Sequence, residues 1–481
     1  MNIGAIKQVG SGKTSTISFT KDQQVAYNEI ISWLNEDYAD NDFKRALVGP
    51  AGTGKTYLVK AIITNCGYSH STIGLAAPTH KACRVLNESI NLSTVKVNTL
   101  QSDLGLRLNY EGDNFSIDNP PFDPRGKIKI NGYKFYIVDE SSMINRSLMM
   151  LLEKHIKANK VKLLYIGDAS QLAPVRETYS AAFRGIKTYK LTQIVRQGDD
   201  NPISDLLKLL RYDIEHKSFT FLQYIERNRS RYNEDNTKGY CVLSPSEFNS
   251  AVYTNFSDSQ LTTNIDFTKV VAYTNNCVSN WNKYIRNAII ENADKAVLTK
   301  NDLIISYTTI VDDFNECIIK NSEEYIINDI VNYVHPRYKL KGFLVKFTAI
   351  HGGKTTKPLF IIDHKDTFTM QMYIKLSDDF INAAKQGNVR NRSALWKEYY
   401  EFKESCLLLI NVVNREGKIL YSRNLDYGFA LTAHKSQGST FDTTLVDVND
   451  IVFDKNGKIY TNAEEINRRL YVACSRCKNK L

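Results

Sequence analysis

Short apolar runs alternate along the first part of the chain with polar turns and with stretches of helical spacing. Residues 46–48, 72–77, 134–138 and 161–166 predict buried strands, each followed by polar residues. The segment after Thr20, a candidate N-cap, has apolar residues at helical spacing and predicts an early helix. Repeated units of strand, polar turn and helix predict an α/β fold with a parallel, doubly wound sheet.

The first predicted strand runs into a glycine-rich loop, Gly49-Pro50-Ala51-Gly52-Thr53-Gly54-Lys55-Thr56, which matches the phosphate-binding pattern GxxxxGK(S/T) in full. A helical pattern follows at residues 57–63, and this order of strand, loop and helix is the context that the pattern requires. The backbone N–H groups of such a loop surround a triphosphate, Lys55 reaches the β- and γ-phosphates, and Thr56 binds Mg²⁺. The sequence therefore predicts a nucleotide site.

The N-terminal residues contain a partial copy of this loop at Gly10–Thr14. Lys7 stands where a glycine should open the loop, and no apolar run precedes it. We therefore expect residues 1–18 to form a flexible arm.

The composition is that of an ordinary globular protein, with 481 residues, 42% hydrophobic and 24% charged. No apolar run approaches the ~18 residues that span a membrane, so we expect a cytoplasmic protein. The eight cysteines are scattered, and the CxxC at Cys474–Cys477 has no second pair, so we expect reduced thiols and no zinc. A net charge of +10 suits a polyanionic partner.

Polar groups gather where the predicted strands end. The stretch Pro78-Thr79-His80-Lys81 follows the second strand and supplies hydroxyl, imidazole and ammonium groups. Asp139 and Glu140 follow the third, where Asp139 is placed to hold Mg²⁺ and Glu140 to polarise an attacking water. Parallel strands end at one edge of a sheet, where ligands bind, so these groups are expected near the loop. Gln23, in the early helix, is either an adenine-binding amide or a solvated helix residue.

A series of stretches, in a fixed order, resembles the motifs of superfamily 1 helicases. They are Asp139–Ser142 (DESS), Gly167–Val175 (GDASQLAPV), Leu191–Gln197 (LTQIVRQ), Val271–Asn275 (VAYTN), Tyr427–Gly438 (YGFALTAHKSQG) and Leu470–Arg476 (LYVACSR). Any single one of these stretches could arise by chance, but their occurrence together in this order is specific to the family. With a short insertion at residues 105–132, the order most resembles superfamily 1B, the phage Dda helicase and its RecD-like relatives, from Phe19 to the C-terminus.

This resemblance implies two RecA-like P-loop domains, each with a parallel sheet covered by helices on both faces. The implied boundaries are 19–190 for the first motor domain, interrupted by a pin insertion at 105–132, then 191–290 and 424–481 for the second, and 291–423 for an SH3-like β-barrel with a helical extension. Strand-like patterns at 303–307, 343–347 and 359–363, and a helical pattern at 394–404, suit the last of these insertions.

In this family ATP lies between the two motor domains, and the resemblance assigns roles residue by residue. The implied catalytic residues are Lys55, Asp139, Glu140, Gln171, Arg196 and Arg476, with both arginines facing the γ-phosphate. The implied ATP-binding residues are Gln23, Gly49 to Thr56 and Gly438, and the implied metal ligands are Thr56 and Asp139. The implied DNA-binding residues are Pro78, Thr79, His80, Lys81, Thr99, Thr274, Asn275, Thr432, His434, Trp396 and Tyr400.

The sequence departs from the family pattern in two places. Gln101 stands where relatives commonly have histidine, so no DNA contact is assigned to it. Relatives continue into a further strand after the residue that matches Arg476, whereas this chain ends at Leu481. We therefore expect Arg476 to be less firmly held than in relatives.

Aromatic side chains in the two insertions have two interpretations each. Trp396 and Tyr400, at i and i+4 of a predicted helix, either stack on bases or pack in the core. Phe115, where relatives have a pin-tip aromatic, either caps the last base pair as a wedge for strand separation or packs the hairpin onto its neighbour. A two-stranded hairpin is predicted by apolar residues that alternate with polar ones, namely Leu106, Leu108, Tyr110, Phe115, Ile117, Phe122, Ile128 and Ile130.

The resemblance implies an ATP- and Mg²⁺-dependent DNA helicase that translocates 5′ to 3′ on single-stranded DNA, in phage replication or recombination in the host cytoplasm. Its implied partners are single-stranded and forked duplex DNA, with a single-strand-binding protein or other replication proteins as candidates; we expect a monomer and no membrane. A DNA-stimulated ATPase that displaces proteins with little strand separation is the alternative. A P-loop kinase or nucleotide-binding regulator would have no use for Arg196 and Arg476.

Overall fold

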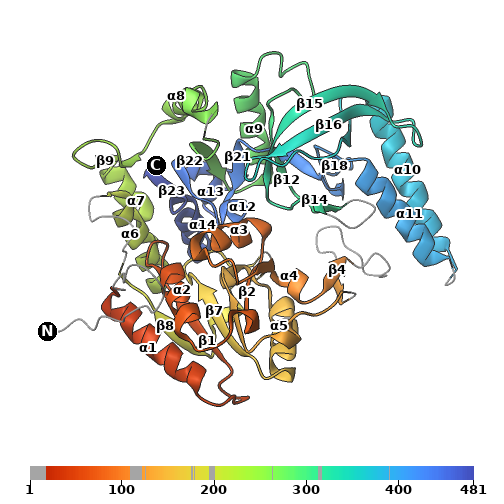
Figure 1. The fold of residues 1–481 in the computed structure, drawn as a ribbon. Helices are drawn as coiled ribbons and strands as arrows, with labels where there is room; N and C mark the ends of the chain where they lie inside the picture. Colours follow the sequence, from red (N-terminus) through yellow and green to blue (C-terminus); the bar gives the residue numbers. More distant parts are fainter. Residues whose placement is uncertain are drawn as a thin grey trace. The chain divides into compact units, whose positions relative to one another are not determined.

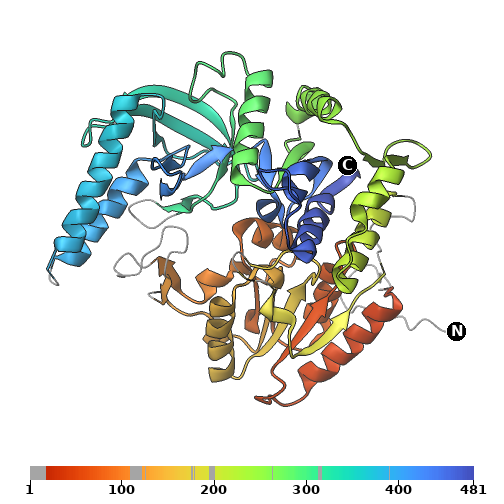
Figure 2. The ribbon, with the colours of Figure 1, turned by 180° about the vertical axis from the view of Figure 1, so that it is seen from behind.

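A computed structural model describes residues 18–108, 122–124, 126–174, 177, 179–193, 201–262, 264–311, 317–388 and 391–481. The chain divides into two compact units (Figures 1 and 2). Unit 1 comprises residues 1–78, 82–104 and 128–200, and unit 2 comprises residues 79–81, 105–127 and 201–481. Each unit has its own central sheet.

The sheet of unit 1 has six strands in the order β3-β2-β6-β7-β1-β8 and is parallel throughout. Its strands are β1 (Lys44–Val48), β2 (Ile73–Ala77), β3 (Val97–Thr99), β6 (Phe135–Val138), β7 (Lys162–Gly167) and β8 (Lys187–Lys190). The helices around it are α1 (Lys21–Asn35), α2 (Lys55–Asn65), α3 (His80–Ile90), α4 (Leu100–Asp103) and α5 (Arg146–Ala158). The strands predicted from the apolar runs are confirmed, because fully buried strands read as continuous apolar sequence.

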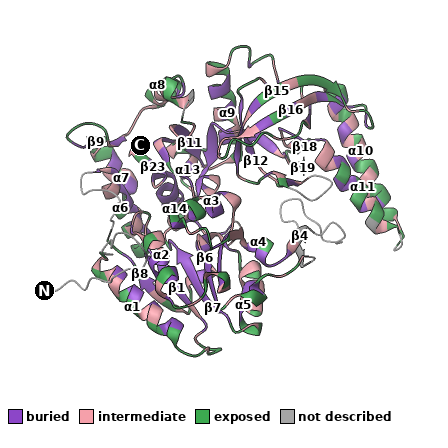
Figure 3. Ribbon diagram, in the orientation of Figure 1, coloured by how far each residue is buried: buried purple, intermediate pink, exposed green. Residues whose placement is uncertain are grey.

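Two local signals set the boundaries of the early helix and of the phosphate-binding loop. The hydroxyl of Thr20 accepts the N–H of Gln23, so Thr20 caps α1 as predicted, and the Gln23 side chain accepts the N–H of Thr20, which completes a capping box. Gly54 precedes α2 with φ +74°, a left-handed conformation that only glycine adopts cheaply. Helices α1 and α2 pack on each other and share one apolar core with the strands. Figure 3 shows the strands of this sheet buried and the outer surfaces of the helices exposed.

The main sheet of unit 2 also has six strands, in the order β21-β11-β22-β23-β10-β9. Its strands are β9 (Ser230–Tyr232), β10 (Gly239–Cys241), β11 (Thr268–Ala272), β21 (Ala430–Thr432), β22 (Phe441–Val446) and β23 (Cys477–Lys480). All neighbours are parallel except β9, which is antiparallel to β10. The helices with this sheet are α6 (Ile203–His216), α7 (Phe221–Arg227), α8 (Pro245–Phe256), α9 (Asn275–Ile289), α12 (Ala433–Ser436), α13 (Val448–Val452) and α14 (Ala463–Cys474). Both units therefore contain the predicted parallel sheets of an α/β fold.

A second sheet in unit 2 is antiparallel and has the order β17-β16-β15-β12-β20. It consists of β12 (Leu303–Ser306), β15 (Glu324–Val334), β16 (Lys341–Ala349), β17 (Leu359–Ile362) and β20 (Leu425–Tyr427). Two strand pairs, β13 (Ile310–Val311) with β14 (Cys317–Ile319) and β18 (Val412–Val413) with β19 (Ile419–Tyr421), accompany it. Helices α10 (Thr367–Gln386) and α11 (Arg392–Ser405) pack side by side beyond its long hairpin (Figure 1). The predicted strands and helix of this region are confirmed, and the SH3-like classification stays a prediction.

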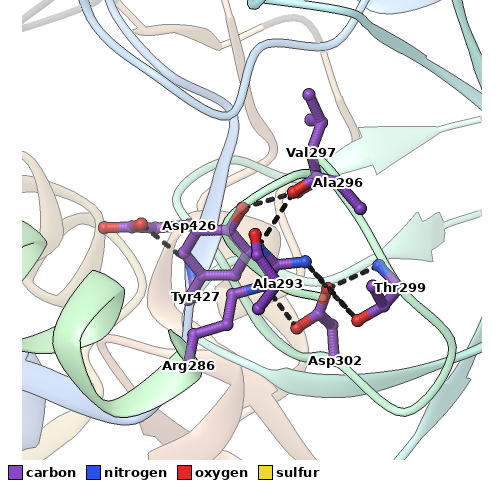
Figure 4. Close-up of polar contacts among 8 residues, drawn as sticks. All are labelled: Arg286, Ala293, Ala296, Val297, Thr299, Asp302, Asp426 and Tyr427. Atoms are coloured by element: carbon purple, nitrogen blue, oxygen red, sulfur yellow. Dashed lines mark hydrogen bonds and ion pairs between the residues drawn. The ribbon is translucent and has the colours of Figure 1, made fainter. Parts of the chain in front are cut away.

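A buried ion pair connects α9 to the start of the antiparallel sheet (Figure 4). Arg286 donates two hydrogen bonds to Asp302, from Nε at 2.7 Å and from Nη2 at 2.9 Å. Its Nη1 donates to the carbonyls of Ala293 and Ala296, and its guanidinium lies 4.8 Å from the ring centroid of Tyr427 in β20. Asp302 also accepts the backbone N–H of Thr299 at 2.7 Å. The guanidinium thus closes the loop between α9 and β12 and orders it against β20.

We expect Asp302→Ala to destabilise unit 2 by about 3–5 kcal/mol, because it leaves the Arg286 guanidinium buried without its counter-ion. The side chains of Arg286 and Asp302 are only 4% and 0% exposed. Asp329→Ala is the matched control, since the Lys346–Asp329 pair has side chains 45% and 57% exposed. Its loss should be at most about 1 kcal/mol. Urea denaturation of both variants would measure the difference, and equal midpoints would contradict this role of the ion pair.

The predicted hairpin of the 105–132 insertion is confirmed only at its base. Strands β4 (Leu106–Leu108) and β5 (Phe122–Pro124) pair antiparallel, with Leu106 opposite Pro124. The expectation that the second arm extends to Ile130 is wrong, because Ile130 begins a 3₁₀ turn and is fully buried. Its apolar side chain serves the core rather than a hairpin face. Tyr110, Phe115 and Ile117 lie outside the described residues.

Candidate functional site

The carboxyl edge of the first sheet gathers the polar groups that the sequence singled out. The phosphate-binding loop follows β1, Asp139 follows β6, and Asp168 follows β7. Pro78 follows β2, and Thr99 ends β3. All these strands run parallel, so their ends lie along one edge, as expected. Gly49 is tied directly to the end of β7, since its N–H donates to the Gly167 carbonyl at 3.1 Å.

The phosphate-binding loop is held in shape by its own lysine. Lys55 Nζ donates to the carbonyls of Gly49 at 2.6 Å and Pro50 at 2.9 Å. Gly52 and Gly54 have φ of +83° and +74°, which direct successive backbone N–H groups along the turn into α2. The ammonium and the start of α2 therefore lie on one short loop, the arrangement that binds a polyphosphate.

Gln23 is built into this loop. Its side chain is 3% exposed, its Nε2 donates to the Thr53 carbonyl at 2.9 Å, and its Oε1 accepts the N–H of Thr20 at 3.0 Å. The alternative of a solvated helix residue is therefore wrong. A Cβ on Gly54 would lie 2.6 Å from the Gln23 amide nitrogen, so only glycine permits this approach. The adenine-binding role of Gln23 stays a prediction.

The two acidic residues after β6 differ in their environments. Burial raises the pKa of Asp139, while the N–H of Glu140 and the positive charge of Lys55 oppose that rise. The N–H of Glu140 donates to Asp139 Oδ1 at 2.9 Å. Glu140 itself has φ +48° and ψ +38°, a left-handed conformation that costs a non-glycine residue about 1–3 kcal/mol. Such strain clusters at functional sites, where a side chain must take a fixed direction.

The donors at this edge fit Mg²⁺. Thr56 lies in the first turn of α2 next to Lys55, and Asp139 is a half-buried carboxyl whose pKa is raised by desolvation, so a cation would stabilise its charged form. Mg²⁺ prefers oxygen ligands and is commonly held by one or two carboxylates together with phosphates and water. The described part of the chain contains no group of three or more His, Cys, Asp or Glu that could hold a metal, and a phosphate-completed Mg²⁺ site requires none.

Gln171 and Asp168 lie beside this pair, after β7. Both are buried, with 6% and 3% of their surface exposed. The carboxylate of Asp168 accepts the N–H of Ser170 at 2.9 Å, and its carbonyl accepts the N–H of Gln171. The turn therefore places the Gln171 amide at the same edge as the phosphate-binding loop.

Asp22 is a residue that the sequence analysis missed. Its Oδ2 accepts the N–H groups of Thr192 at 2.6 Å and of Gln193 at 3.2 Å. Burial raises the pKa of this carboxyl, but hydrogen bonds from Thr20, Thr192, Gln193 and Gln23 outweigh it and lower the pKa to about 2. Asp22 thus anchors the start of the LTQIVRQ stretch. An acidic residue in the first turn of a helix indicates an interaction with the helix dipole, and nothing in the sequence pointed to Thr192 as its partner. Arg196, three residues further, lies outside the described residues.

Arg476 is firmly held in unit 2, which corrects the expectation drawn from the short C-terminus. It is 4% exposed, and it donates from Nε to the Val472 carbonyl at 3.1 Å and from Nη1 to the Ser439 carbonyl at 3.2 Å. The residues after it form β23, which pairs between β22 and β10. The strand that relatives were expected to supply is therefore present here. Gly438, with φ +72°, lies in the same turn region as Ser439.

Two of the residues that the resemblance assigns to DNA binding lie at the carboxyl edge of the main sheet of unit 2. Thr274 caps α9 after β11, Thr432 caps α12 after β21, and β11 and β21 pair with Ala272 opposite Thr432. The Thr274 hydroxyl donates to Asp450 at 2.6 Å. Burial lowers the pKa of His434, so the imidazole is held neutral and can accept or donate a hydrogen bond. Asn275 accepts a hydrogen bond from Arg423 at 3.4 Å.

The other proposed DNA contacts are more diverse. Thr99 caps α4 by accepting the N–H of Ser102, and burial lowers the pKa of His80 at the start of α3.

Lys81, which groups with unit 2, is 6% exposed and pairs with Glu324 at 3.3 Å. The buried Lys269 also pairs with Glu324, at 2.7 Å. Burial raises the pKa of Glu324, but the two lysines outweigh it and bring the pKa to about 2. Pro78 and Thr79 are half-buried.

Trp396 and Tyr400 lie in a buried aromatic cluster. They are 8% and 7% exposed and pack with Tyr399 and Ala384, and the Trp396 and Tyr400 ring centroids are 6.2 Å apart. This is the core-packing interpretation of the pair. Stacking on bases stays a prediction for them. Phe115, the proposed wedge, lies outside the described residues.

Comparison with known proteins gives three findings. Residues 20–229 match a family model described as an AAA domain. An uncharacterised protein of Acanthamoeba polyphaga mimivirus is 24% identical over 96% of this chain and 99% of its own length. The ATP-dependent RecD2 DNA helicase of Deinococcus radiodurans is 32% identical, over 33% of this chain and 20% of its own length.

Solved structures of Pif1 helicases are similar over most of the chain at low identity. The enzyme of Candida albicans is 17% identical, with a TM-score of 0.46, over 96% of this chain and 92% of that chain. A Bacteroides Pif1 helicase, solved in complex with ADP-AlF3 and ssDNA, is 15% identical, with a TM-score of 0.47, over 96% and 91%. No helix among the described residues is long and apolar enough to cross a membrane. The AAA domain match and the RecD2 alignment support the resemblance to superfamily 1B helicases that the order of the motifs indicates.

Proposed function

We propose that this protein is an ATP-dependent DNA helicase that translocates 5′ to 3′ on single-stranded DNA and unwinds duplex DNA. The observation that carries the ATPase part is the shared edge of the first sheet. It brings the phosphate-binding loop with Lys55 next to Asp139 and Glu140. The RecD2 relative is described as an ATP-dependent DNA helicase, which supports DNA as the second substrate. Replication or recombination of a phage is the proposed setting.

Each residue of the edge has a proposed part in hydrolysis. Lys55 and the loop N–H groups bind the β- and γ-phosphates, and Thr56 with Asp139 would hold Mg²⁺, which neutralises charge on the phosphates when bound. Glu140 orients and polarises the attacking water, and Gln171 contacts the γ-phosphate. Arg196 and Arg476 neutralise charge that develops on the transferred group. In this proposal ATP lies between two RecA-like domains, and Gln23 and Gly438 contact the nucleotide.

Single-stranded DNA is proposed to bind through hydroxyl, amide and imidazole groups at strand ends. Such groups suit phosphate contacts, which position a strand without reading its sequence. The proposed contacts are Pro78, Thr79, His80, Lys81, Thr99, Thr274, Asn275, Thr432 and His434, with Trp396 and Tyr400 as base-stacking candidates. Thr274 must exchange Asp450 for a phosphate in order to donate its hydroxyl proton. The proposed domain boundaries, the SH3-like insertion and a monomeric state belong to the same proposal.

Strand displacement on duplexes with a 5′ or a 3′ single-stranded tail tests the function directly. The expected result is ATP- and Mg²⁺-dependent unwinding of the 5′-tailed duplex alone. Unwinding of the 3′-tailed duplex would reverse the polarity. DNA-stimulated hydrolysis with displacement of a bound protein, but without strand separation, would favour the remodelling ATPase instead. Absence of DNA-stimulated hydrolysis would reject both functions.

Binding to single strands should be nearly independent of sequence and strongly weakened by salt. The proposed contacts go to phosphates, and the chain has a net charge of +10. The logarithm of the binding constant should fall with the logarithm of salt concentration at a slope of about −0.7 per phosphate neutralised. Fluorescence anisotropy with oligonucleotides of different sequence measures this slope. A flat titration, or strong preference for one sequence, would contradict the proposed contacts.

Phe115→Ala should retain DNA-stimulated hydrolysis and translocation but lose most duplex unwinding, if Phe115 caps the last base pair. Stacking of an aromatic ring on a base contributes about 1–3 kcal/mol. Parallel assays of ATPase, single-strand translocation and unwinding would separate the two interpretations. Unchanged unwinding would reject the wedge, and a joint fall of all three activities with thermal stability would indicate packing alone.

A further inference from the structure

Arg469, on α14, is held between two tyrosine rings. Its guanidinium carbon lies 3.4 Å from the ring centroid of Tyr273 and 4.9 Å from that of Tyr460. Nη2 donates to the Tyr273 hydroxyl at 2.7 Å and also binds the carboxylate of Glu465, one turn earlier on the helix. The residue is only 4% exposed. Cation–π contact with two rings is therefore a main part of its environment.

The remaining guanidinium donors are not used for hydrogen bonding. Nε and Nη1 of Arg469 are buried without an acceptor among the described residues. Leaving buried polar groups unpaired costs free energy, so a smaller apolar side chain would satisfy this position at lower cost. The arrangement therefore points to a positioning role, in which the planar guanidinium fixes the Tyr273 ring.

Tyr273 directly precedes Thr274 and Asn275, two of the residues proposed to contact DNA, in the stretch Tyr273-Thr274-Asn275. Asp450 of α13 accepts the N–H groups of Tyr273 and Thr274, each at 2.7 Å. Arg469 binds the side chain of the same stretch, because it donates a hydrogen bond to the Tyr273 hydroxyl. Two helices, α13 and α14, thus fix this stretch, one by its backbone and one by its tyrosine ring.

Helix α14 also lies next to His434, another residue proposed to contact DNA. It packs against α12, which carries His434, and the positive charge of Arg469 lowers the pKa of His434 in addition to the effect of burial. At the far end of α14, the Val472 carbonyl accepts the Nε hydrogen bond of Arg476. One rigid helix therefore links the proposed DNA contacts to the proposed γ-phosphate finger.

We propose that Arg469 is a positioning residue that couples nucleotide state to DNA grip through α14. This inference rests on the proposed function. A shift of Arg476 on engaging the γ-phosphate would move α14, and the Arg469 guanidinium would carry that movement to the Tyr273 ring and so to Thr274 and Asn275. Arg469 touches neither substrate in this role.

The test compares hydrolysis and DNA binding in the full-length chain. Arg469→Lys keeps the charge but loses the planar contact with both rings, and Tyr460→Leu removes one ring while leaving Arg469 in place. Arg468→Gln is the matched control, because Arg468 makes the same i,i+4 pair, with Glu464, on the same helix. The readouts are the ratio of kcat with and without single-stranded DNA, and the ratio of DNA affinities with and without a non-hydrolysable ATP analogue.

For Arg469→Lys and Tyr460→Leu, both ratios should fall about five- to tenfold, the usual size of a coupling between two sites. The KM for ATP and the melting temperature should stay close to wild type, and Arg468→Gln should keep both ratios. Wild-type ratios in the two variants, or an equal fall in the control, would overturn the inference. A higher KM for ATP together with a lower melting temperature would also overturn it, because that result indicates a purely structural role. If wild-type protein shows no stimulation by DNA, the proposed function itself fails and the inference fails with it.

Discussion

Glu140→Gln is expected to bind ATP and Mg²⁺ nearly as wild type does, yet to lose about 10²–10⁴-fold in DNA-stimulated hydrolysis. The amide retains the size and hydrogen-bonding reach of the carboxylate but cannot take up a proton from water. Glu140 is held in a left-handed conformation after β6, with its N–H bound to Asp139. The side chain therefore starts from a fixed backbone, and the substitution removes only its basicity. Steady-state ATPase assays with saturating oligonucleotide measure the effect.

Glu153→Gln is the matched control for this experiment. Glu153 lies on α5 and pairs at 2.7 Å with Lys44, the first residue of β1, so it lies at the opposite end of that strand from the phosphate-binding loop. The Glu153→Gln variant should hydrolyse ATP at the wild-type rate. Turnover of Glu140→Gln close to wild type would remove Glu140 from the role of general base.

Arg476→Gln should show an even larger loss, of about 10³–10⁵-fold in kcat, if the arginine neutralises charge on the transferred phosphoryl group. Glutamine cannot replace a delocalised cation, whereas ATP binding through Lys55 and the phosphate-binding loop should persist. Rapid-quench measurement of hydrolysis, together with equilibrium binding of a fluorescent ATP analogue, separates the two effects.

Because Arg476 is buried and donates to Val472 and Ser439, its loss also affects packing. Thermal denaturation must therefore accompany the kinetics, with Arg468→Gln, on the helix α14 that precedes Arg476, as the control variant. A small rate effect in a stably folded Arg476→Gln would contradict the finger assignment. A large loss of kcat at an unchanged melting temperature would support it.

The sequence predicted the elements whose residues are constrained locally. Continuous apolar runs gave the buried parallel strands, because both faces of such a strand are covered and polar residues are excluded from it. The early helix was predicted because its N-cap Thr20 and the apolar residues at helical spacing after it are close together in the chain. The phosphate-binding loop was predicted because contiguous residues form it.

The predictions that were wrong depended on contacts between residues far apart in the chain. The C-terminal residues were expected to leave Arg476 loosely held, yet they form β23 because β22 and β10 present unpaired edges on both sides. The second arm of the hairpin was extended to Ile130 by its apolar alternation. That side chain is instead used by the core of unit 1, which the alternation alone could not reveal.

The amino-acid sequence by itself determined the class of fold, the phosphate-binding loop, the acidic pair at 139 and 140 and the order of the helicase motifs, since each depends on neighbours in the chain. Only the tertiary structure decided the roles of Asp22, Asp450 and Arg469. Their partners lie between about 170 and 200 residues away, in Thr192, Thr274 and Tyr273. A carboxylate or a guanidinium carries no local pattern that names its distant acceptor or donor, and only folding brings the two groups to hydrogen-bonding distance.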